Sequence, residues 1–149
     1  MSFIKWTKLV ILFAAVNCIG TKSVSAQTVW LDQLDLSVAT QGFGTPQKNK
    51  SVDGNTITIA GKTFEHGFGT HAESSLFVQL DGKANSFTAQ VGIDDEIKGH
   101  EPAVEFVVYG DKVKLWSSGI MRLGDAPKLC SVELTGVKRL ELVVTDGGN

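Results

Sequence analysis

The sequence predicts an all-β domain, built as a sandwich or a barrel. Apolar and polar residues alternate over short runs such as Thr56–Ile59, as expected for a strand with one buried face. These runs recur at spacings of roughly 8–12 residues with turn signals between them. No stretch of ten or more residues keeps a 3.6-residue apolar period without a glycine or proline. We therefore expect no long amphipathic helix.

The first 26 residues have the composition of a secretory signal peptide. Two lysines provide positive charge near the start, Leu9–Ile19 is apolar, and Val24-Ser25-Ala26 has the small residues of a cleavage site. The apolar stretch is too short for a transmembrane helix. We therefore expect export to the periplasm or the exterior, without a membrane span. Lipidation of Cys18 is the alternative, which Asn17 disfavours because a small residue is expected there.

Cleavage after Ala26 would leave residues 27–149, enough for one domain with its own core. The leader holds three of the 14 Lys and Arg residues and none of the 16 Asp and Glu residues, so the mature charge is −5. This balance argues against nucleic acid and anionic lipid as partners, and it permits neutral ligands and divalent cations. Cys130 is then the only cysteine and is expected to be a small buried hydrophobe, with a link to another chain as the alternative.

The elements follow in chain order from their patterns. Val29–Leu36 is the first predicted strand, and residues 37–54 are polar and form a long loop. His66–Ala72 is a glycine-rich turn, Asp81-Gly82 is a hairpin-type turn, and residues 94–102 form an acidic loop. The other predicted strands are Thr56–Ile59, Thr63–Glu65, Ser75–Leu80, Ser86–Ile93, Val104–Tyr109, Val113–Ser117, Leu129–Leu134 and Arg139–Val144.

Three strands allow finer predictions. Ser86–Ile93 is expected to bury Phe87, Ala89 and Val91 on one face, and Val104–Tyr109 is apolar enough for a central strand. Trp116 alternates out of phase with its apolar neighbours and is therefore expected to face outward. The chain stops directly after its last strand, in a sequence that is typical of a turn opening. We therefore expect the C-terminal end of the domain to be incomplete.

The glycine-rich turn is the first candidate binding element. Glycines flanking Phe68 let the backbone turn tightly, because they have no Cβ. The turn brings the Thr70 hydroxyl beside the His71 imidazole, whose donor and acceptor match a pair of sugar hydroxyls. The alternative is that His71 pins the turn to a neighbouring strand. His66 is expected at the surface.

Consecutive carboxylates and exposed aromatic rings are the second group of candidates. Asp94, Asp95 and Glu96 follow a strand, and a loop can bring carboxylates and carbonyls together around calcium. A solvated acidic loop is the alternative. Trp116 offers a face on which a sugar can stack, although a tryptophan in a sandwich more often packs. Trp30 is expected to pack at the start of the domain.

Several motifs together resemble the NPCBM domain, a carbohydrate-binding module found on secreted bacterial glycosidases. The resemblance runs from about Trp30 to the end of the chain, and it lacks the family's next segment, which is rich in Asp, His, Ala and Trp. It implies a jelly-roll β-sandwich, bound calcium, recognition of terminal galactose-type sugars and a downstream α-galactosidase catalytic domain. The matching segments are Leu31–Leu34, Ala39–Gly44, His66–Ala72, Val91–Glu96 and Leu142–Gly148.

The leading hypothesis is therefore a non-catalytic module that binds galactose-type sugars and targets an attached secreted glycoside hydrolase. The chain has no Gly-x-Ser-x-Gly nucleophile elbow and no metal-binding histidine pair with a glutamate base. A docking sandwich that binds no sugar and a small standalone hydrolase are the alternatives. The predicted site combines Thr70, His71, Glu96 and Trp116 for carbohydrate with Asp94 and Asp95 for calcium.

Overall fold

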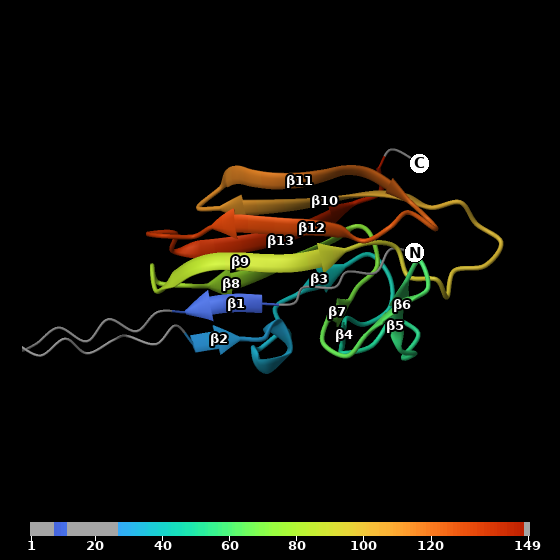
Figure 1. The fold of residues 1–149 in the computed structure, drawn as a ribbon, viewed down its shortest axis with the longest axis horizontal. Coiled ribbons are helices and arrows are strands. Elements are labelled where there is room, and N and C mark those ends of the chain that lie inside the picture. The colour runs from blue at the N-terminus through green and yellow to red at the C-terminus, as the bar shows by residue number, and fades with distance from the viewer. Residues whose placement is uncertain (1–7, 12–26, 148–149) are drawn as a thin grey trace, which may run out of the picture.

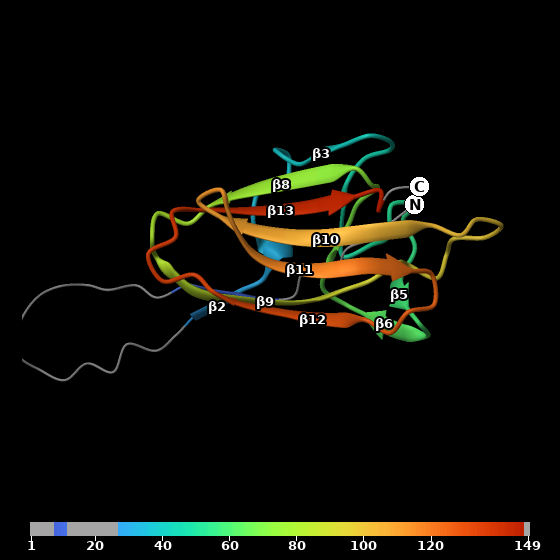
Figure 2. The ribbon, with the colours of Figure 1, turned by 90° about the horizontal axis from the view of Figure 1, so that it is seen from above.

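Two antiparallel sheets form a β-sandwich in the computed structural model, which describes residues 8–11 and 27–147 (Figures 1 and 2). One sheet has the strand order β12-β9-β1-β2 and the other has the order β11-β10-β13-β8-β3. The all-β prediction is confirmed. The strands are β1 (Lys8–Ile11), β2 (Gln27–Val29), β3 (Thr40–Gln41), β8 (Ser74–Gln79), β9 (Ala84–Val91), β10 (Ala103–Gly110), β11 (Val113–Arg122), β12 (Lys128–Glu133) and β13 (Arg139–Thr145).

The inward faces of both sheets meet in one apolar core. Phe87 and Val91 of β9 are fully buried, as is Phe106 of β10, and all three belong to the same cluster. Burying such a side chain contributes about 1.5–3 kcal/mol each. β10 lies between β11 and β13, so its predicted central place is confirmed. Cys130 is also buried, as predicted, and burial raises the pKa of its thiol to about 12.

Two small two-stranded sheets lie at one end of the sandwich, which we call the loop end (Figure 1). β4 (Gln47–Lys48) pairs with β7 (Phe68–Gly69), and β5 (Ile57–Ile59) pairs with β6 (Lys62–Phe64). The β5–β6 pair has its own buried cluster of Ile57, Ile59 and Phe64. The loop between β9 and β10 lies at this same end, whereas the β10–β11 turn lies at the other (Figure 2).

The first predicted strand is wrong over most of its length. β2 ends at Val29, and the 3₁₀ helix η1 (Leu31–Gln33) follows. The Gln33 side chain accepts a hydrogen bond from the Trp30 N–H at 3.0 Å, and this local bond competes with extension of the strand. Leu31 and Leu36 are both buried in the main core, so the apolar residues of this segment pack into the core without forming a strand.

The Asp81-Gly82 turn has the expected backbone but joins different sheets. Both residues have positive φ, 52° and 70°, as a tight turn requires. The strands on either side, β8 and β9, do not pair, because β8 belongs to the five-stranded sheet and β9 to the four-stranded one. The hairpin prediction is therefore wrong although the turn prediction is correct.

The outward orientation predicted for Trp116 is also wrong. Trp116 pairs with Val108, a buried core residue, and packs half-buried against the same core. Val113, one of the apolar neighbours with which Trp116 alternates, is 63% exposed. The register of β10 and β11 shifts between Val108 and Tyr109, and this irregularity reverses the simple alternation.

Part of the predicted signal peptide lies among the described residues. Lys8–Ile11 forms β1 and pairs with both β9 and β2, while residues 1–7, 12–26 and 148–149 lie outside the described part of the chain. Cleavage after Ala26 and an incomplete C-terminal end stay predictions. Within the described residues, no helix has the length and hydropathy needed to span a membrane.

Candidate functional site

The glycine-rich turn is pressed against the backbone of the preceding loop. A Cβ placed on Gly69 would lie 2.2 Å from the Lys50 carbonyl oxygen and 2.9 Å from the Ser51 Cα, so a larger residue does not fit. This close approach fixes both ends of the turn. His66 lies on one side of it, and Thr70 and His71 lie on the other.

Thr70 and His71 are held by one glutamine of β3. The Thr70 hydroxyl donates to Gln41 Oε1 at 2.6 Å, and the His71 N–H donates to the same oxygen at 3.1 Å. Thr70 is fully buried, and His71 Nδ1 contacts the Ala72 carbonyl. These contacts match the alternative in which His71 pins the turn to a neighbouring strand. A sugar-binding role for the two residues stays a prediction.

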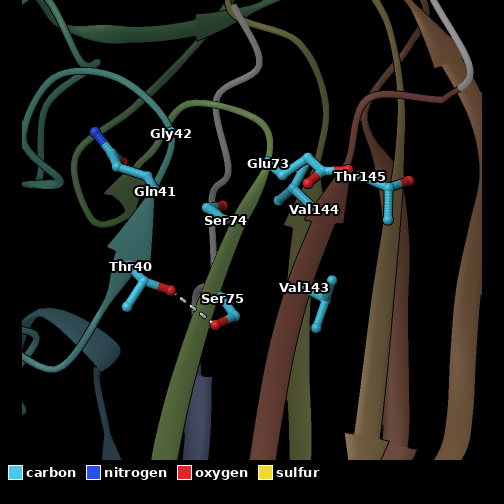
Figure 3. A pocket seen from close by; sticks show the side chains of 9 residues that line it. All are labelled: Thr40, Gln41, Gly42, Glu73, Ser74, Ser75, Val143, Val144 and Thr145. Carbon is cyan, nitrogen blue, oxygen red and sulfur yellow. Dashed lines mark hydrogen bonds between the residues drawn. The ribbon is translucent and has the colours of Figure 1, made fainter.

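A groove of about 440 Å³ lies beside this pair, between β3, β8 and β13 (Figure 3). Two hydroxyls in it, Thr40 Oγ1 and Ser75 Oγ, are 3.0 Å apart and bond each other. Its lining contains no aromatic ring, which a sugar-stacking site would use. The lining residues are Thr40, Gln41, Gly42, Glu73, Ser74, Ser75, Val143, Val144 and Thr145.

Asp94 and Asp95 fasten the β5–β6 pair to the end of β9. Asp94 Oδ2 accepts the Thr58 N–H at 2.9 Å. The Asp95 carboxylate accepts the N–H groups of Ala60 at 2.9 Å and Gly61 at 2.7 Å. Each carboxylate therefore satisfies backbone donors in a turn.

Glu96 fastens the loop that follows β4. Its Oε2 accepts the Ser51 hydroxyl at 2.5 Å and the Asn55 side-chain N–H at 2.9 Å. Ser51 is fully buried, and its backbone lies against Gly69. Glu96 therefore supports the glycine-rich turn indirectly, through Ser51. A direct contact between Glu96 and a sugar stays a prediction.

The described geometry does not fit calcium at Asp94 and Asp95. The Asp94 and Asp95 oxygens face N–H donors, and a cation would have to displace those bonds. Among residues 27–147, no group of three or more acidic, histidine or cysteine side chains converges as a metal site. Burial raises the pKa of Asp94 to about 6; backbone donors oppose this shift, and the neighbouring charges of Glu96 and Asp95 add to it. Calcium here stays a prediction that these contacts do not support.

Trp116 lies apart from the other predicted site residues. Its partner Val108 is five residues along β10 from Ala103, where the strand leaves the loop end. That separation corresponds to roughly 16 Å along the strand. The structure therefore gathers Thr70, His71 and Glu96 around one region but does not bring Trp116 to it.

A group that the sequence reasoning missed lies on the other side of the glycine-rich turn. We call it the Trp30 corner, and it consists of Trp30, Asp32, Asn49 and His66. The His66 imidazole stacks on the Trp30 indole with centroids 4.4 Å apart and planes inclined by 15°. Asp32 Oδ2 lies 2.9 Å from His66 Nδ1 and accepts the Asn49 side-chain N–H at 2.7 Å.

The backbone around Asn49 completes the corner. Asn49 has a φ of 58°, in the left-handed region that asparagine tolerates better than most residues. Its Oδ1 accepts the Gly67 N–H at 2.9 Å, which ties the corner to the glycine-rich turn. Two chain segments, around residues 30–32 and at Asn49, therefore hold the His66 segment in one orientation.

The electrostatics of the Trp30 corner are unusual for a surface site. The Asp32 side chain is only 9% exposed, whereas that of His66 is 43% exposed. Burial raises the pKa of Asp32, but hydrogen bonds from the His66 ring and the Asn49 side chain oppose burial, and the pKa lies below its usual value. Asp32 Oδ1 is the one buried side-chain polar atom among the described residues that has no hydrogen-bond partner. Leaving such an acceptor unpaired costs about 1–3 kcal/mol.

The fold and its loop-end clusters define a small ligand-binding β-sandwich. The NPCBM/NEW2 domain model matches residues 27–149, and the chain belongs to that family. The chain is 32% identical over 133 residues to a Renibacterium salmoninarum protein assigned as an endo-alpha-N-acetylgalactosaminidase. It is 35% identical over 112 residues to alpha-1,3-galactosidase B of Akkermansia muciniphila. These matches cover 85% and 72% of the chain but only 9% and 14% of those relatives.

Solved structures share the fold. A CBM51 module from a Clostridium perfringens GH95 protein, in complex with methyl-galactose, is 37% identical with a TM-score of 0.74 and matches over 81% of this chain and 88% of that one. A structure of the CBM51-2 and INT domains of C. perfringens ZmpB is 25% identical with a TM-score of 0.76, over 97% and 34% of the two chains. The chain is thus an NPCBM domain with the fold of a carbohydrate-binding module.

Proposed function

We propose that this domain is a non-catalytic carbohydrate-binding module for galactose-type sugars. In this proposal it is exported and is attached to a glycoside hydrolase of the α-galactosidase type. The observation that carries the proposal is the 37% identity, over most of both chains, to a module in complex with methyl-galactose. The two glycosidase relatives, of which this chain matches only a small part, support attachment to a larger enzyme.

The physical role of such a module is to raise the local concentration of the attached enzyme at its substrate. A linked binding site converts the second encounter with a polymeric substrate into an intramolecular one. Affinity for a single sugar is expected to be weak, because a monosaccharide has few atoms to bury. Release is then fast enough for the attached enzyme to move along its substrate.

The test is an isothermal titration calorimetry experiment in which the full chain is titrated with methyl-galactoside. We expect binding with a dissociation constant near the millimolar range, and weaker binding of methyl-glucoside. The absence of heat at tens of millimolar galactoside, with and without added calcium, would contradict the proposal. The calcium arm also tests whether a bound ion contributes.

Two rival functions predict different outcomes. A docking sandwich would use exposed apolar side chains, such as Phe77 at 37% and Leu129 at 60% exposure, and would bind no sugar. A standalone hydrolase would release nitrophenol from a nitrophenyl galactoside, and Glu96→Gln would abolish that release. A chain that binds galactoside without turnover would exclude both rivals.

A further inference from the structure

Two regions near the glycine-rich turn are candidates for the saccharide-binding site. The groove beside Gln41 is roomy, but its Thr40 and Ser75 hydroxyls already bond each other and its lining has no ring. The Trp30 corner combines a ring stack, a half-exposed imidazole, an amide and a buried carboxylate with one unpaired oxygen. Of the two regions, only the corner has a buried side-chain polar atom that lacks a partner among the described residues.

The contacts of His66 fix what its exposed edge offers. A carboxylate only accepts hydrogen bonds, so the 2.9 Å contact with Asp32 Oδ2 requires a proton on His66 Nδ1. In the neutral ring, Nε2 is then an acceptor. The stack on Trp30 and the bond to Asp32 hold this acceptor in one direction, so little freedom is lost when a ligand binds.

The unpaired oxygen of Asp32 adds a second acceptor to the same corner. Its side chain is 9% exposed, and Oδ1 has no donor among the described residues. Because Oδ1 is buried, a hydroxyl that enters beside His66 can supply the missing donor through one bridging water. Two acceptors near a ring stack match the O–H donors and the C–H face of a sugar.

The same contacts disfavour other classes of ligand. A metal ion would have to displace the bond between His66 Nδ1 and Asp32 Oδ2, and the corner has no third metal-ligating side chain among the described residues. An anion would be repelled by the Asp32 carboxylate, whose lowered pKa keeps it charged at neutral pH. A neutral polyhydroxyl ligand meets neither obstacle.

We infer that the Trp30 corner is the saccharide-binding site of this domain. His66 Nε2 accepts a hydroxyl of the sugar, and Asp32 is a positioning residue that holds the imidazole in the required tautomer. This inference rests on the proposed carbohydrate-binding function and names the site for it. Neither Trp30 nor His66 was among the residues predicted to bind sugar.

The histidines of the chain make a direct test possible. There are only three, His66, His71 and His100, so the imidazole nitrogens of the ¹⁵N-labelled full chain can be assigned by substitution. At a pH where the imidazole is neutral, we expect the proton of the His66 ring on Nδ1 and none on Nε2 before ligand is added. Methyl-galactoside should shift the His66 ring signals and leave those of His71 and His100 in place.

Substitutions give the second readout. His66→Ala should weaken methyl-galactoside binding at least tenfold, and His66→Gln, which keeps a side-chain acceptor, should weaken it less. His100→Ala is the matched surface control and should bind within twofold of wild type. Movement of the His71 signals instead, or unchanged binding by His66→Ala, would overturn the site while the carbohydrate-binding function survives. A wild-type chain that binds no galactoside would overturn the function and the site together.

Discussion

Two histidines five residues apart, on either side of the same turn, have different surroundings. His66 is 43% exposed, and its ring is held by Trp30, 36 residues away in sequence, and by Asp32, 34 residues away. The His71 side chain contacts the carbonyl of its own neighbour, Ala72, and lies edge-on to Phe43 with centroids 5.6 Å apart. The His66 ring is therefore stacked on an indole and bonded to a carboxylate, whereas the His71 ring is bonded to a backbone carbonyl within the turn.

Both rings are oriented through Nδ1, which contacts the Asp32 carboxylate in His66 and the Ala72 carbonyl in His71. Such a contact leaves the other ring nitrogen for a ligand. We infer that His66 is the binding residue of the two because its corner adds a stacked indole and a buried carboxylate oxygen that has no partner among the described residues. Motif position alone does not separate the two, because both histidines flank the same Gly67–Thr70 turn.

Gly69→Ala should have the largest effect, because it breaks both sides of the comparison. The added Cβ would lie 2.2 Å from the Lys50 carbonyl oxygen, so the turn must move away from the preceding loop. We expect a loss of about 3 kcal/mol in the free energy of unfolding, measured by urea denaturation. Gly42→Ala is the control, because its nearest neighbours lie at 3.9 Å. Equal stability of the two variants would contradict the close approach.

Asp94→Asn tests the acidic segment beside the turn that both histidines flank, because Asp94 accepts the Glu96 N–H and the Glu96 side chain binds Ser51. The pKa of Asp94 is raised by burial to about 6, so the folded state binds a proton more tightly than the unfolded state. The contribution of Asp94 to the free energy of unfolding of the wild type should therefore be highest below about pH 4 and should fall as the pH rises to about 6. The variant should lack this decline in denaturation curves recorded across that range. A decline of the same size in both proteins would refute the role of Asp94.

Asp32→Asn sharpens the comparison on the His66 side. The amide keeps the shape of the carboxylate but can donate to His66 Nδ1, which permits the tautomer with Nε2 protonated. Methyl-galactoside binding should weaken about tenfold, which corresponds to about 1.4 kcal/mol. Asp35→Asn is the control, because that exposed carboxylate caps only the Ser37 N–H. Wild-type affinity with a changed tautomer would show that the tautomer does not matter.

Thr70→Val should have the smallest effect and tests the other side. The variant loses a buried hydrogen bond to Gln41, but Gln41 Oε1 keeps the N–H of His71 as a donor. We expect a loss of about 1 kcal/mol in stability and no change in galactoside affinity. Thr45→Val, at an exposed threonine, is the control for the substitution itself. A clear loss of affinity in Thr70→Val but not in Thr45→Val would indicate that the sugar binds at Thr70 and His71 instead.

Strands with one buried face were predictable from sequence because burial produces alternation. Phe87, Ala89 and Val91 of β9 share the buried face as expected. Trp116 was misplaced because a register shift in β11 reverses the alternation, and no local pattern marks such a shift. Val29–Leu36 was misread because a side-chain bond from Gln33 ends the strand early.

The Trp30 corner was not predictable for a different reason. The partners Asp32 and His66 are 34 residues apart, and Asn49 joins them only because it adopts a left-handed backbone. The glycine-rich turn was expected to present binding side chains, which stays a prediction, and its sequence could not show which neighbouring side chains converge on it. The choice between His66 and His71 depends on long-range contacts that only the folded chain provides.

Three adjacent acids, Asp94, Asp95 and Glu96, hold the continuous segment 51–61 at three places: residues 51–55, the middle of β5 and the β5–β6 turn. Detaching this tripeptide would therefore release the whole segment at once. Backbone amides in the segment should exchange with solvent as a single cooperative unit, opening together well before the sheets separate. The loop end is in that sense a separate cooperative unit, which unfolds more easily than the two sheets of the sandwich.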